Sequence, residues 1–390
     1  MSSKVLSLAA LLGASSLATF AQRNTREKLP TQLEGAVPRA QTLHVKVEGG
    51  SIRLQGYSGD RIAYEVHRSD SSDSVRAPAQ DVPFYKVATY KHGATSWLVA
   101  TPQNDQSGIR PVELVVRVPR EVQSVALETS GGDVFVHDVP GRVDVQTGGG
   151  HLQLDDVGVI TAETGGEDID VGTVEGDGRF RTGGGTISVR YIRGNLDAFT
   201  GGGGISLQTG LRNAVLESGA GDIQVTFCGG ELKVRNGGGN LVLGDIGGSA
   251  DIRTEGGNLR LRSAKGFVRA HTTAGDIELD GIPSTDASTE VGAITAKFTA
   301  SSGQRRNSIL QTNVGDITVY LPADLPVTVR ASVALSAGHR ITSDIPGIQV
   351  GQDGDRWAPT IIAEGNVNGG GPVLEVYAGN GNITLKKQDR

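Results

Sequence analysis

The chain is poor in cysteine, methionine and aromatic residues. Among its 390 residues are one Cys, one Met and two Trp, and aromatic side chains make up 4% of the total. A single cysteine excludes an intrachain disulfide and a metal site built from several cysteines. The scarcity of large side chains argues against a helical bundle and favours short strands joined by tight turns.

The chain also lacks a strong excess of charge and, beyond its N-terminus, a long hydrophobic run. Its net charge is −6 and both signs are interspersed, so nothing global indicates a nucleic acid or an anionic membrane as partner. No stretch after residue 21 approaches the roughly 18 consecutive apolar residues of a membrane helix, and we predict no membrane span.

The N-terminus has the pattern of a secretory signal peptide over residues 1–21. Lys4 precedes a mostly apolar run, and small residues from Ala18 to Ala21 end it before Gln22. This order of charge, apolar run and small residues is typical of export signals. We therefore expect an exported protein, located in the periplasm, at the cell surface or outside the cell, with a linker over 22–40.

Glycine, in contrast, is abundant, with 57 residues. It recurs in a phrase that returns about every 18 residues: Thr, three small residues ending in Gly, one variable residue, and two apolar residues one apart. The phrase occurs at 147–154, 182–189, 200–207 and 272–279. A fixed short period predicts a stack of similar rungs, each in contact mainly with its neighbours.

Each rung contains one apolar anchor residue. Successive anchors are 17 or 18 residues apart, except for a last step of 23, and they are Val134, Leu152, Ile169, Ile187, Ile205, Ile223, Leu241, Leu259, Ile277, Ile294 and Ile317. Apolar or small residues favour offsets 2, 5, 9 and 11 from the anchor. A spacing of two is strand periodicity, so each rung should contain two short strands.

These offsets predict an all-β fold: a two-sided β-solenoid, related to β-helices and β-rolls, with rungs of about 18 residues and β-rich caps at both ends. The left-handed helix built on hexapeptides does not fit, because Arg193 and Phe199 stand six and twelve residues after Ile187. We expect an N-terminal β-rich cap region at 41–127, the regular solenoid at 128–321, and degenerate rungs with a cap at 322–390. Caps are expected because an open solenoid end exposes unpaired backbone groups.

Three columns of residues should form the corner of the rungs. A hydroxyl or amide, such as Thr200, stands thirteen residues after most anchors and should satisfy turn backbone groups. A Gly such as Gly203 stands two residues before nearly every anchor, which suits a positive φ or closely spaced rungs. Asp or Asn often precedes the anchor directly, as at Asp222. Calcium-binding β-rolls place Asp two residues before the apolar position, so turn capping is favoured over calcium.

Cys228 stands at offset 5, where other rungs have Val or Ile. We therefore interpret it as part of the core rather than as a reactive thiol. No residue pattern indicates a cofactor.

Basic residues recur at positions that should point outward. They are Arg179, Arg181, Lys233, Arg235, Arg253, Arg269 and His271 on second strands, joined by Arg260 and Arg262 on a first strand. One hypothesis is a stripe that binds a polyanion such as an envelope polysaccharide. The favoured interpretation is a solvated charge ladder, partly paired with Asp197, Glu217 and Asp251, in which each surface pair contributes little.

Several linked motifs resemble a known family. They are VVRVP at 115–119 leading into SVALETSGGDV at 124–134, the repeated Gly-Asp/Asn-Ile/Leu rungs, NVGDITVYLP at 313–322 and GNGNI at 379–383. In their order and composition they resemble the bacterial putative adhesin-domain family, a group of exported β-solenoid proteins of largely unknown function. The resemblance covers roughly 41–387 and implies an envelope location and work that is not enzymatic. It supplies no catalytic residues.

We therefore expect a non-enzymatic, adhesin-like or scaffold protein whose long flat faces bind an envelope polysaccharide or another envelope protein. One alternative is an envelope-stress sensor or regulatory binding module. The other is a β-helix carbohydrate-active enzyme, for which Asp155 and Asp170, near Gly172, could supply paired carboxylates. Neither a cleft nor a nucleophile motif supports that enzyme.

Overall fold

The computed structural model describes residues 33–68, 85–102, 112–300, 305–335, 338–353 and 360–388. Every regular element in these ranges is a β-strand, and they contain no helix that could cross a membrane. The expected signal peptide, 1–21, and most of the expected linker, 22–40, lie outside the described residues.

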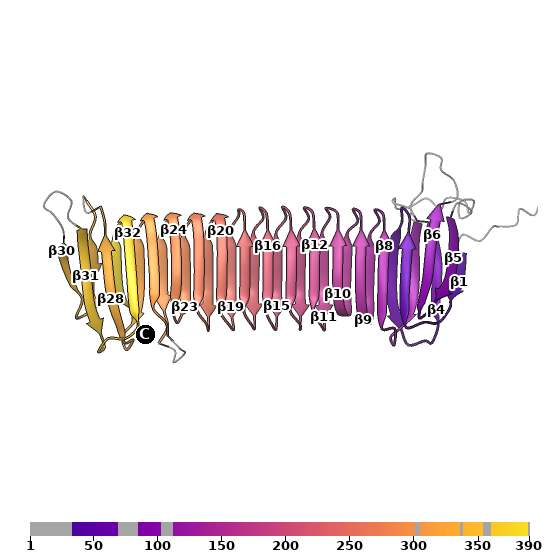
Figure 1. The fold of residues 1–390 in the computed structure, drawn as a ribbon, viewed down its shortest axis with the longest axis horizontal. Coiled ribbons are helices and arrows are strands. Elements are labelled where there is room, and N and C mark those ends of the chain that lie inside the picture. The colour runs from indigo at the N-terminus through magenta and orange to yellow at the C-terminus, as the bar shows by residue number, and fades with distance from the viewer. Residues whose placement is uncertain are drawn as a thin grey trace, which may run out of the picture.

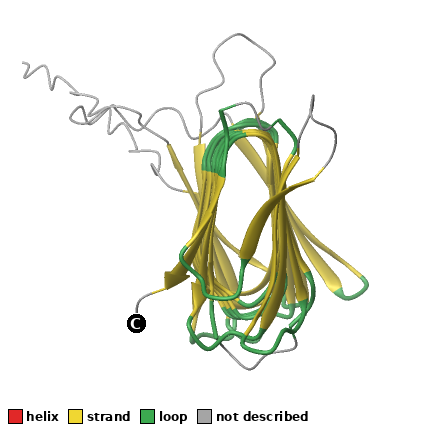
Figure 2. Ribbon diagram, turned by 90° about the vertical axis from the view of Figure 1, so that its left-hand side faces the viewer, coloured by secondary structure: helices red, strands yellow, loops and turns green. Residues whose placement is uncertain are grey.

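The strands form an elongated stack of rungs (Figure 1) whose two sheets face each other and are joined by turns at both edges (Figure 2). Two long strands, β9 (Val134–Thr147) and β10 (Leu152–Thr164), contribute their first halves to one sheet and their second halves to the other. We call these sheet 1 and sheet 2. The all-β solenoid predicted from the sequence is thereby confirmed.

Sheet 1 continues through the first strand of each later rung: β11 (Ile169–Val174), β13 (Ile187–Ile192), β15 (Ile205–Gly210), β17 (Ile223–Cys228), β19 (Leu241–Ile246), β21 (Leu259–Ala264), β23 (Ile277–Ile282), β25 (Ile294–Phe298) and β27 (Ile317–Pro322). Sheet 2 continues through the second strand: β12 (Gly178–Thr182), β14 (Leu196–Thr200), β16 (Ala214–Ser218), β18 (Leu232–Asn236), β20 (Ala250–Gly256), β22 (Val268–Ala274), β24 (Thr285–Val291) and β26 (Ser308–Val314).

Neighbouring rungs pair in parallel and in register with the repeat. Ile187 pairs with Ile205, which pairs with Ile223, and the same register continues through the other anchors. Every predicted anchor is at most 1% exposed. Within one rung, Ile223, Val225 and Cys228 of β17 are buried, and so are Leu232 and Val234 of β18. The core is thus a column of aliphatic side chains between the sheets, each contributing about 1.5–3 kcal/mol by burial.

Buried hydroxyls join the corner of one rung to the corner of the rung before. The Thr200 hydroxyl, which is fully buried, donates to the carbonyl oxygen of Gly185 at 2.7 Å and accepts the Gly203 N–H at 3.0 Å. Thr147, Thr182 and Ser218 make the same two bonds. The predicted hydroxyl ladder is therefore confirmed in these rungs.

The hydroxyl ladder changes at two corners in the C-terminal half of the stack, whereas Thr289 and Thr312 still donate to the glycine carbonyl one rung back. Thr254 donates to Gly256 within its own turn, and the buried hydroxyl of Thr272 has no partner. Here the strands of sheet 2 extend further into the corner, so that Gly256 pairs with Ala274. The corner is therefore built in two ways along one stack.

The glycine column reflects close packing of successive corners. A Cβ placed on Gly203 would lie 2.1 Å from the carbonyl oxygen of Gly185, one rung earlier. A positive φ is an additional requirement only from Gly239 onward, as in Gly257 with a φ of 100°. Both reasons expected for this column occur, in different parts of the stack.

Aspartate and asparagine residues before the anchors accept backbone N–H groups from the next rung. The Asp222 carboxylate accepts the N–H of Asn240 at 2.7 Å. Equivalent bonds link Asp133, Asp168, Asp276 and Asp316 to the following rung. The turn-capping interpretation of these residues is confirmed.

The N-terminal end places its first rung inside the stack. Beyond β9, sheet 1 contains in spatial order β3 (Ser51–Tyr57), β7 (Val112–Pro119), β4 (Ile62–Arg68) and β1 (Leu33–Val37), and sheet 2 contains β8 (Ser124–Thr129), β2 (Thr42–Val47), β6 (Thr95–Pro102) and β5 (Tyr85–His92). The rung formed by β2 and β3 therefore lies between two rungs that come later in the chain.

The C-terminal end also has a rung inserted between rungs that are distant from it in the sequence. Beyond β27, sheet 1 contains β33 (Ile383–Gln388) and β29 (Ile341–Ser343), and beyond β26, sheet 2 contains β32 (Val373–Asn380), β28 (Val327–Val333), β31 (Thr360–Val367) and β30 (Gln349–Asp353). The last rung, β32 and β33, returns into the stack, where the yellow β32 is flanked by orange strands (Figure 1). Antiparallel strands finish sheet 2 here and both sheets at the N-terminal end, which confirms the predicted β-rich caps.

The close approach at the corner predicts different costs for two neighbouring glycines. Gly203→Ala should lower the free energy of unfolding by about 2 kcal/mol, because its Cβ would overlap the Gly185 carbonyl. Gly202→Ala should be neutral or stabilising by about 0.5 kcal/mol, since nothing lies within 4 Å of a Cβ there. Urea unfolding followed by circular dichroism measures both, and equal effects would contradict the close approach.

The two kinds of corner predict opposite outcomes for one type of substitution. Thr200→Val should cost about 1–3 kcal/mol, because it leaves the Gly185 carbonyl and the Gly203 N–H without their buried partner. Thr272→Val, equally buried, should be neutral or stabilising, because that hydroxyl is unpaired. Thermal unfolding of both variants tests this, and a loss at Thr272 as large as at Thr200 would rule it out.

Candidate functional site

The structure divides the nine predicted basic residues between the two sheets. Those on the outer face of sheet 2 are Arg179 and Arg181 on β12, Lys233 and Arg235 on β18, Arg253 on β20, and Arg269 and His271 on β22. Arg260 and Arg262 are on β21 and therefore on the outer face of sheet 1. The nine residues do not form one continuous surface, because the two strands of a rung belong to opposite sheets.

Most of these cations have a carboxylate partner on the same face. Ion pairs form between Arg179 and Asp197 at 3.0 Å, Arg181 and Asp197 at 3.3 Å, Arg235 and Glu217 at 3.9 Å, Arg253 and Asp251 at 3.4 Å, and Arg269 and Asp286 at 3.7 Å. On sheet 1, Arg260 pairs with Glu278 and Arg262 with Asp245. His271 contacts the Ser288 hydroxyl at 2.8 Å.

Lys233 is the exception among the lysine and arginine residues of this set, since no ion pair joins it to another described residue. In register with it are Asp251 on β20 and, one rung further, Arg269. Charges therefore alternate along this column, and each exposed pair contributes about 0–1 kcal/mol. This geometry favours the charge-ladder interpretation over a polyanion stripe.

A shallow hollow on sheet 1 includes Gly172 in its lining, and the Asp155 carboxylate occupies the space that a side chain at Gly172 would need. Asp155 and Asp170 both line it, as the enzyme alternative requires. Asp155 accepts the Thr173 N–H at 2.7 Å and lies 3.2 Å from Arg190, and Asp170 lies 3.2 Å from His151. Both carboxylates are more than one third exposed. A glycosidase acid requires apolar surroundings that keep it protonated, and neither residue has them.

One group of side chains beside this hollow has the composition of a metal site. The ligand atoms of His137, Asp155 and Asp156 lie within 4.8 Å of one another. His137 and Asp155 are register partners on β9 and β10. The guanidinium of Arg190 already lies beside Asp155, and a cation there opposes a metal ion. Sequence reasoning missed this group because it compared the histidines only with one another, whereas the register of β9 with β10 brings His137 beside Asp155.

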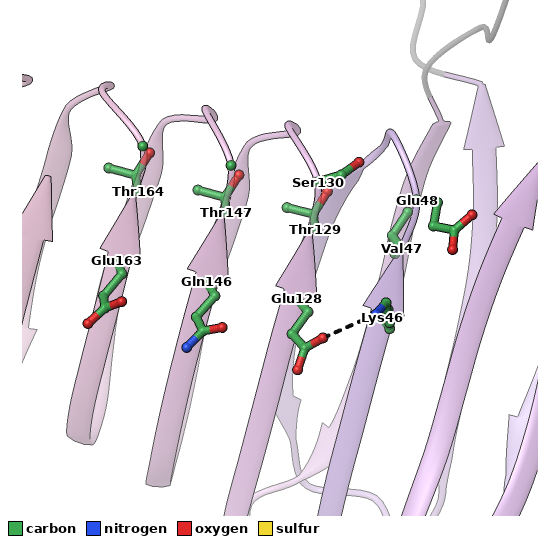
Figure 3. A pocket seen from close by; sticks show the side chains of 12 residues that line it. Lys46, Val47, Glu48, Glu128, Thr129, Ser130, Gln146, Thr147, Glu163 and Thr164 are labelled. Atoms are coloured by element: carbon green, nitrogen blue, oxygen red, sulfur yellow. Dashed lines mark ion pairs between the residues drawn. The ribbon is translucent and has the colours of Figure 1, made fainter. Parts of the chain in front are cut away.

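A second hollow, of about 510 Å³, lies near the N-terminal end of the stack (Figure 3). Glu128, Gln146 and Glu163 form its row of acceptors, in register on β8, β9 and β10. Lys46 on β2 continues the row, and Glu48 lies beyond the end of β2. We call these five residues the acceptor groove. The corners at Thr129, Thr147 and Thr164 border it (Figure 3).

Charge in the acceptor groove is only partly compensated. Glu128 contacts His44 at 2.9 Å and Lys46 at 3.6 Å. No ion pair or side-chain hydrogen bond joins the side chains of Glu48, Gln146 or Glu163 to another described residue. The groove therefore differs from the middle of the same face, where carboxylates are paired with arginines.

The negative charge of Glu48 also affects the pKa of a buried tyrosine, Tyr85. Burial, followed by the charge of Glu48, raises the pKa of the Tyr85 hydroxyl. That hydroxyl donates to the Glu48 backbone carbonyl at 2.8 Å.

An aromatic ladder adjoins the acceptor groove. Tyr90, Trp97 and His44 are register partners on β5, β6 and β2. The His44 and Trp97 rings stack with centroids 4.0 Å apart, and the Tyr90 and Trp97 rings are nearly parallel at 5.9 Å. His44 connects the ladder to the groove through Glu128. One signal in the sequence could have indicated the groove: acidic or amide residues recur directly before Thr129, Thr147 and Thr164.

Cys228 is fully buried, as its position in the repeat predicted. Burial raises the pKa of its thiol and so disfavours the thiolate.

We therefore expect no reaction of Cys228 with a thiol-specific disulfide reagent at neutral pH in the native protein, and full reaction in denaturant. Absorbance of the released product follows both. Labelling of the folded chain as fast as that of a free thiol would contradict the core assignment.

Comparisons with known proteins give a family and two solved structures. The family model described as Toastrack DUF4097 matches residues 40–338. A putative cell adhesion protein from Clostridium sporogenes is 12% identical, with 92% of this chain and 100% of that chain covered and a TM-score of 0.18. A putative adhesin from Bacteroides fragilis is 12% identical, with 92% and 96% covered and a TM-score of 0.19. No curated protein matches.

Proposed function

The chain belongs to the Toastrack DUF4097 family, and on that premise we propose that it is an exported, non-enzymatic scaffold whose long sheet faces bind an envelope polymer or another envelope protein. The expected signal peptide at 1–21 supports export. A long, rigid stack is well suited to an adhesin-like role, because each added rung extends the binding face without altering the core.

One observation carries the non-enzymatic part of the proposal. Among the described residues no Asp, Glu, His, Lys or Arg is buried, and the buried ionisable groups are the Tyr85 hydroxyl, which is bonded to a backbone carbonyl, and the Cys228 thiol. General acids, bases and nucleophiles are usually tuned by burial beside specific partners. The acidic and basic side chains of the described residues stand instead on open surfaces, where they pair with one another or face solvent.

Retention in envelope material tests the function. Mature protein should sediment with isolated envelope fractions and should release no new reducing ends from the polysaccharides that it retains. Mass spectrometry of exported protein should give an N-terminus at Gln22. Release of oligosaccharide products would contradict the non-enzymatic role, and a full-length N-terminus in the cytoplasm would contradict export.

The paired cations give a further prediction. The triple variant Arg235→Ser/Arg253→Ser/Arg269→Ser should elute from a heparin column within about twofold of the wild-type salt concentration, because each arginine is already beside a carboxylate. A large loss of retention in a folded triple variant would restore the polyanion-stripe hypothesis. Lys233→Ser, the unpaired member of the same face, is the matched comparison.

A further inference from the structure

We propose that the acceptor groove and the aromatic ladder together form a binding site for a glycan that carries free amino groups. This proposal rests on the proposed function, since it assigns a ligand class and a location to a non-enzymatic binding face. It places the site at the N-terminal end of sheet 2, beside Arg181 on β12 and away from the predicted basic residues on β18, β20 and β22.

The groove has hydrogen-bonding capacity that no described residue satisfies. Glu128, Gln146 and Glu163 extend from adjacent parallel strands at the same register. Adjacent strands are about 4.8 Å apart, so the row from Lys46 to Glu163 spans roughly 14 Å. A short oligosaccharide lying along the stack would meet one acceptor per rung, and the corners would border it on one side (Figure 3).

The carboxylates of the groove complement a ligand with positive charge. Lys46 and His44 lie against Glu128, but Glu48 and Glu163 have no cationic partner among the described residues. Arg181, the next residue in register after Glu163, pairs with Asp197 instead. Two carboxylates in a concave surface favour a ligand with positive charge, and ammonium groups on a glycan would donate to them.

The aromatic ladder supplies rings next to the groove. The chain has two Trp residues in all, and Trp97 stands between Tyr90 and His44. This row lies two residues from the row of Lys46 and Glu128 and is joined to it by the contact between His44 and Glu128. Tyr90 is 48% exposed. Aromatic rings offer an apolar surface for the ligand body and attract nearby cations. A purely basic peptide would use the charge of the groove but would not need the Gln146 amide or the rings of the adjacent row.

Calorimetric titration of the mature full-length chain with three probes tests the proposal: a hexamer of β-1,4-linked glucosamine, its fully N-acetylated counterpart and hexalysine. The amino hexamer should bind at least tenfold more tightly than either of the others. Equal binding of the acetylated hexamer would overturn the role of the ammonium groups. Equal binding of hexalysine would show that the groove responds to charge alone and would also overturn the proposal.

Variants locate the site. Glu48→Gln/Glu163→Gln keeps the shape of both side chains and should weaken binding of the amino hexamer at least tenfold. Tyr90→Ala, at an exposed position, should weaken it at least threefold. The control is Glu217→Gln. Glu217 lies in the same outward column, in register beyond Arg181 and Phe199, and its carboxylate is already beside Arg235. This control should bind as the wild type does, and an unchanged affinity in the double variant would exclude the groove.

The outcomes separate this proposal from the function on which it rests. Failure of the wild-type chain to bind the amino hexamer would overturn the glycan site, whereas retention in envelope fractions would still support the scaffold role. Cleavage of the hexamer, detected by mass spectrometry, would instead contradict the non-enzymatic function.

Discussion

The constraint on which this structure depends is the parallel ladder between successive rungs. Each strand pairs with the strand one rung away at an unchanged register, as Ile205 does with Ile187 and Ile223. Every other part of the rung must then repeat at the same strand spacing, about 4.8 Å. The corner is the most demanding part, because its backbone cannot spread. Glycine at Gly203 permits the approach, and the Thr200 hydroxyl satisfies polar groups that the approach would bury.

The same ladder determines how charge is distributed. Inward positions are filled by aliphatic side chains and hydroxyls, so ionisable groups stand in outward columns with neighbours one rung away. Opposite charges in adjacent rungs then pair, as Arg179 does with Asp197. This arrangement leaves little unbalanced charge on most of sheet 2. The acceptor groove differs because Glu48 and Glu163 form no such pair, although Arg181 is in register with Glu163 and pairs with Asp197 instead. This contrast within one face makes the groove the strongest candidate for recognition.

The ends of the stack follow from the same physics. An exposed parallel edge offers unpaired N–H and C=O groups to other chains. At each end of this stack, one complete rung is inserted between rungs that are distant from it in the sequence. Antiparallel strands then form the edge of sheet 2 at both ends and the edge of sheet 1 at the N-terminal end. The β2 rung is thereby held on both sides, by β6 and β8. Such contacts join distant parts of the sequence, unlike those between regular rungs.

The sequence by itself determined the rung, its two strands, its buried anchors and the chemistry of its corner. It could do so because each of these depends on residues within one period, so that Ile223, Thr200 and Asp222 could be assigned from spacing alone. Tertiary structure decided which outward residues share a face. Arg260 and Arg253 are near each other in the chain but lie on opposite sheets. It also decided the acceptor groove, since Lys46 lies beside Glu128 only because the first rung is inserted between later ones. A period records contacts between consecutive rungs, whereas insertion brings together residues that no local pattern connects.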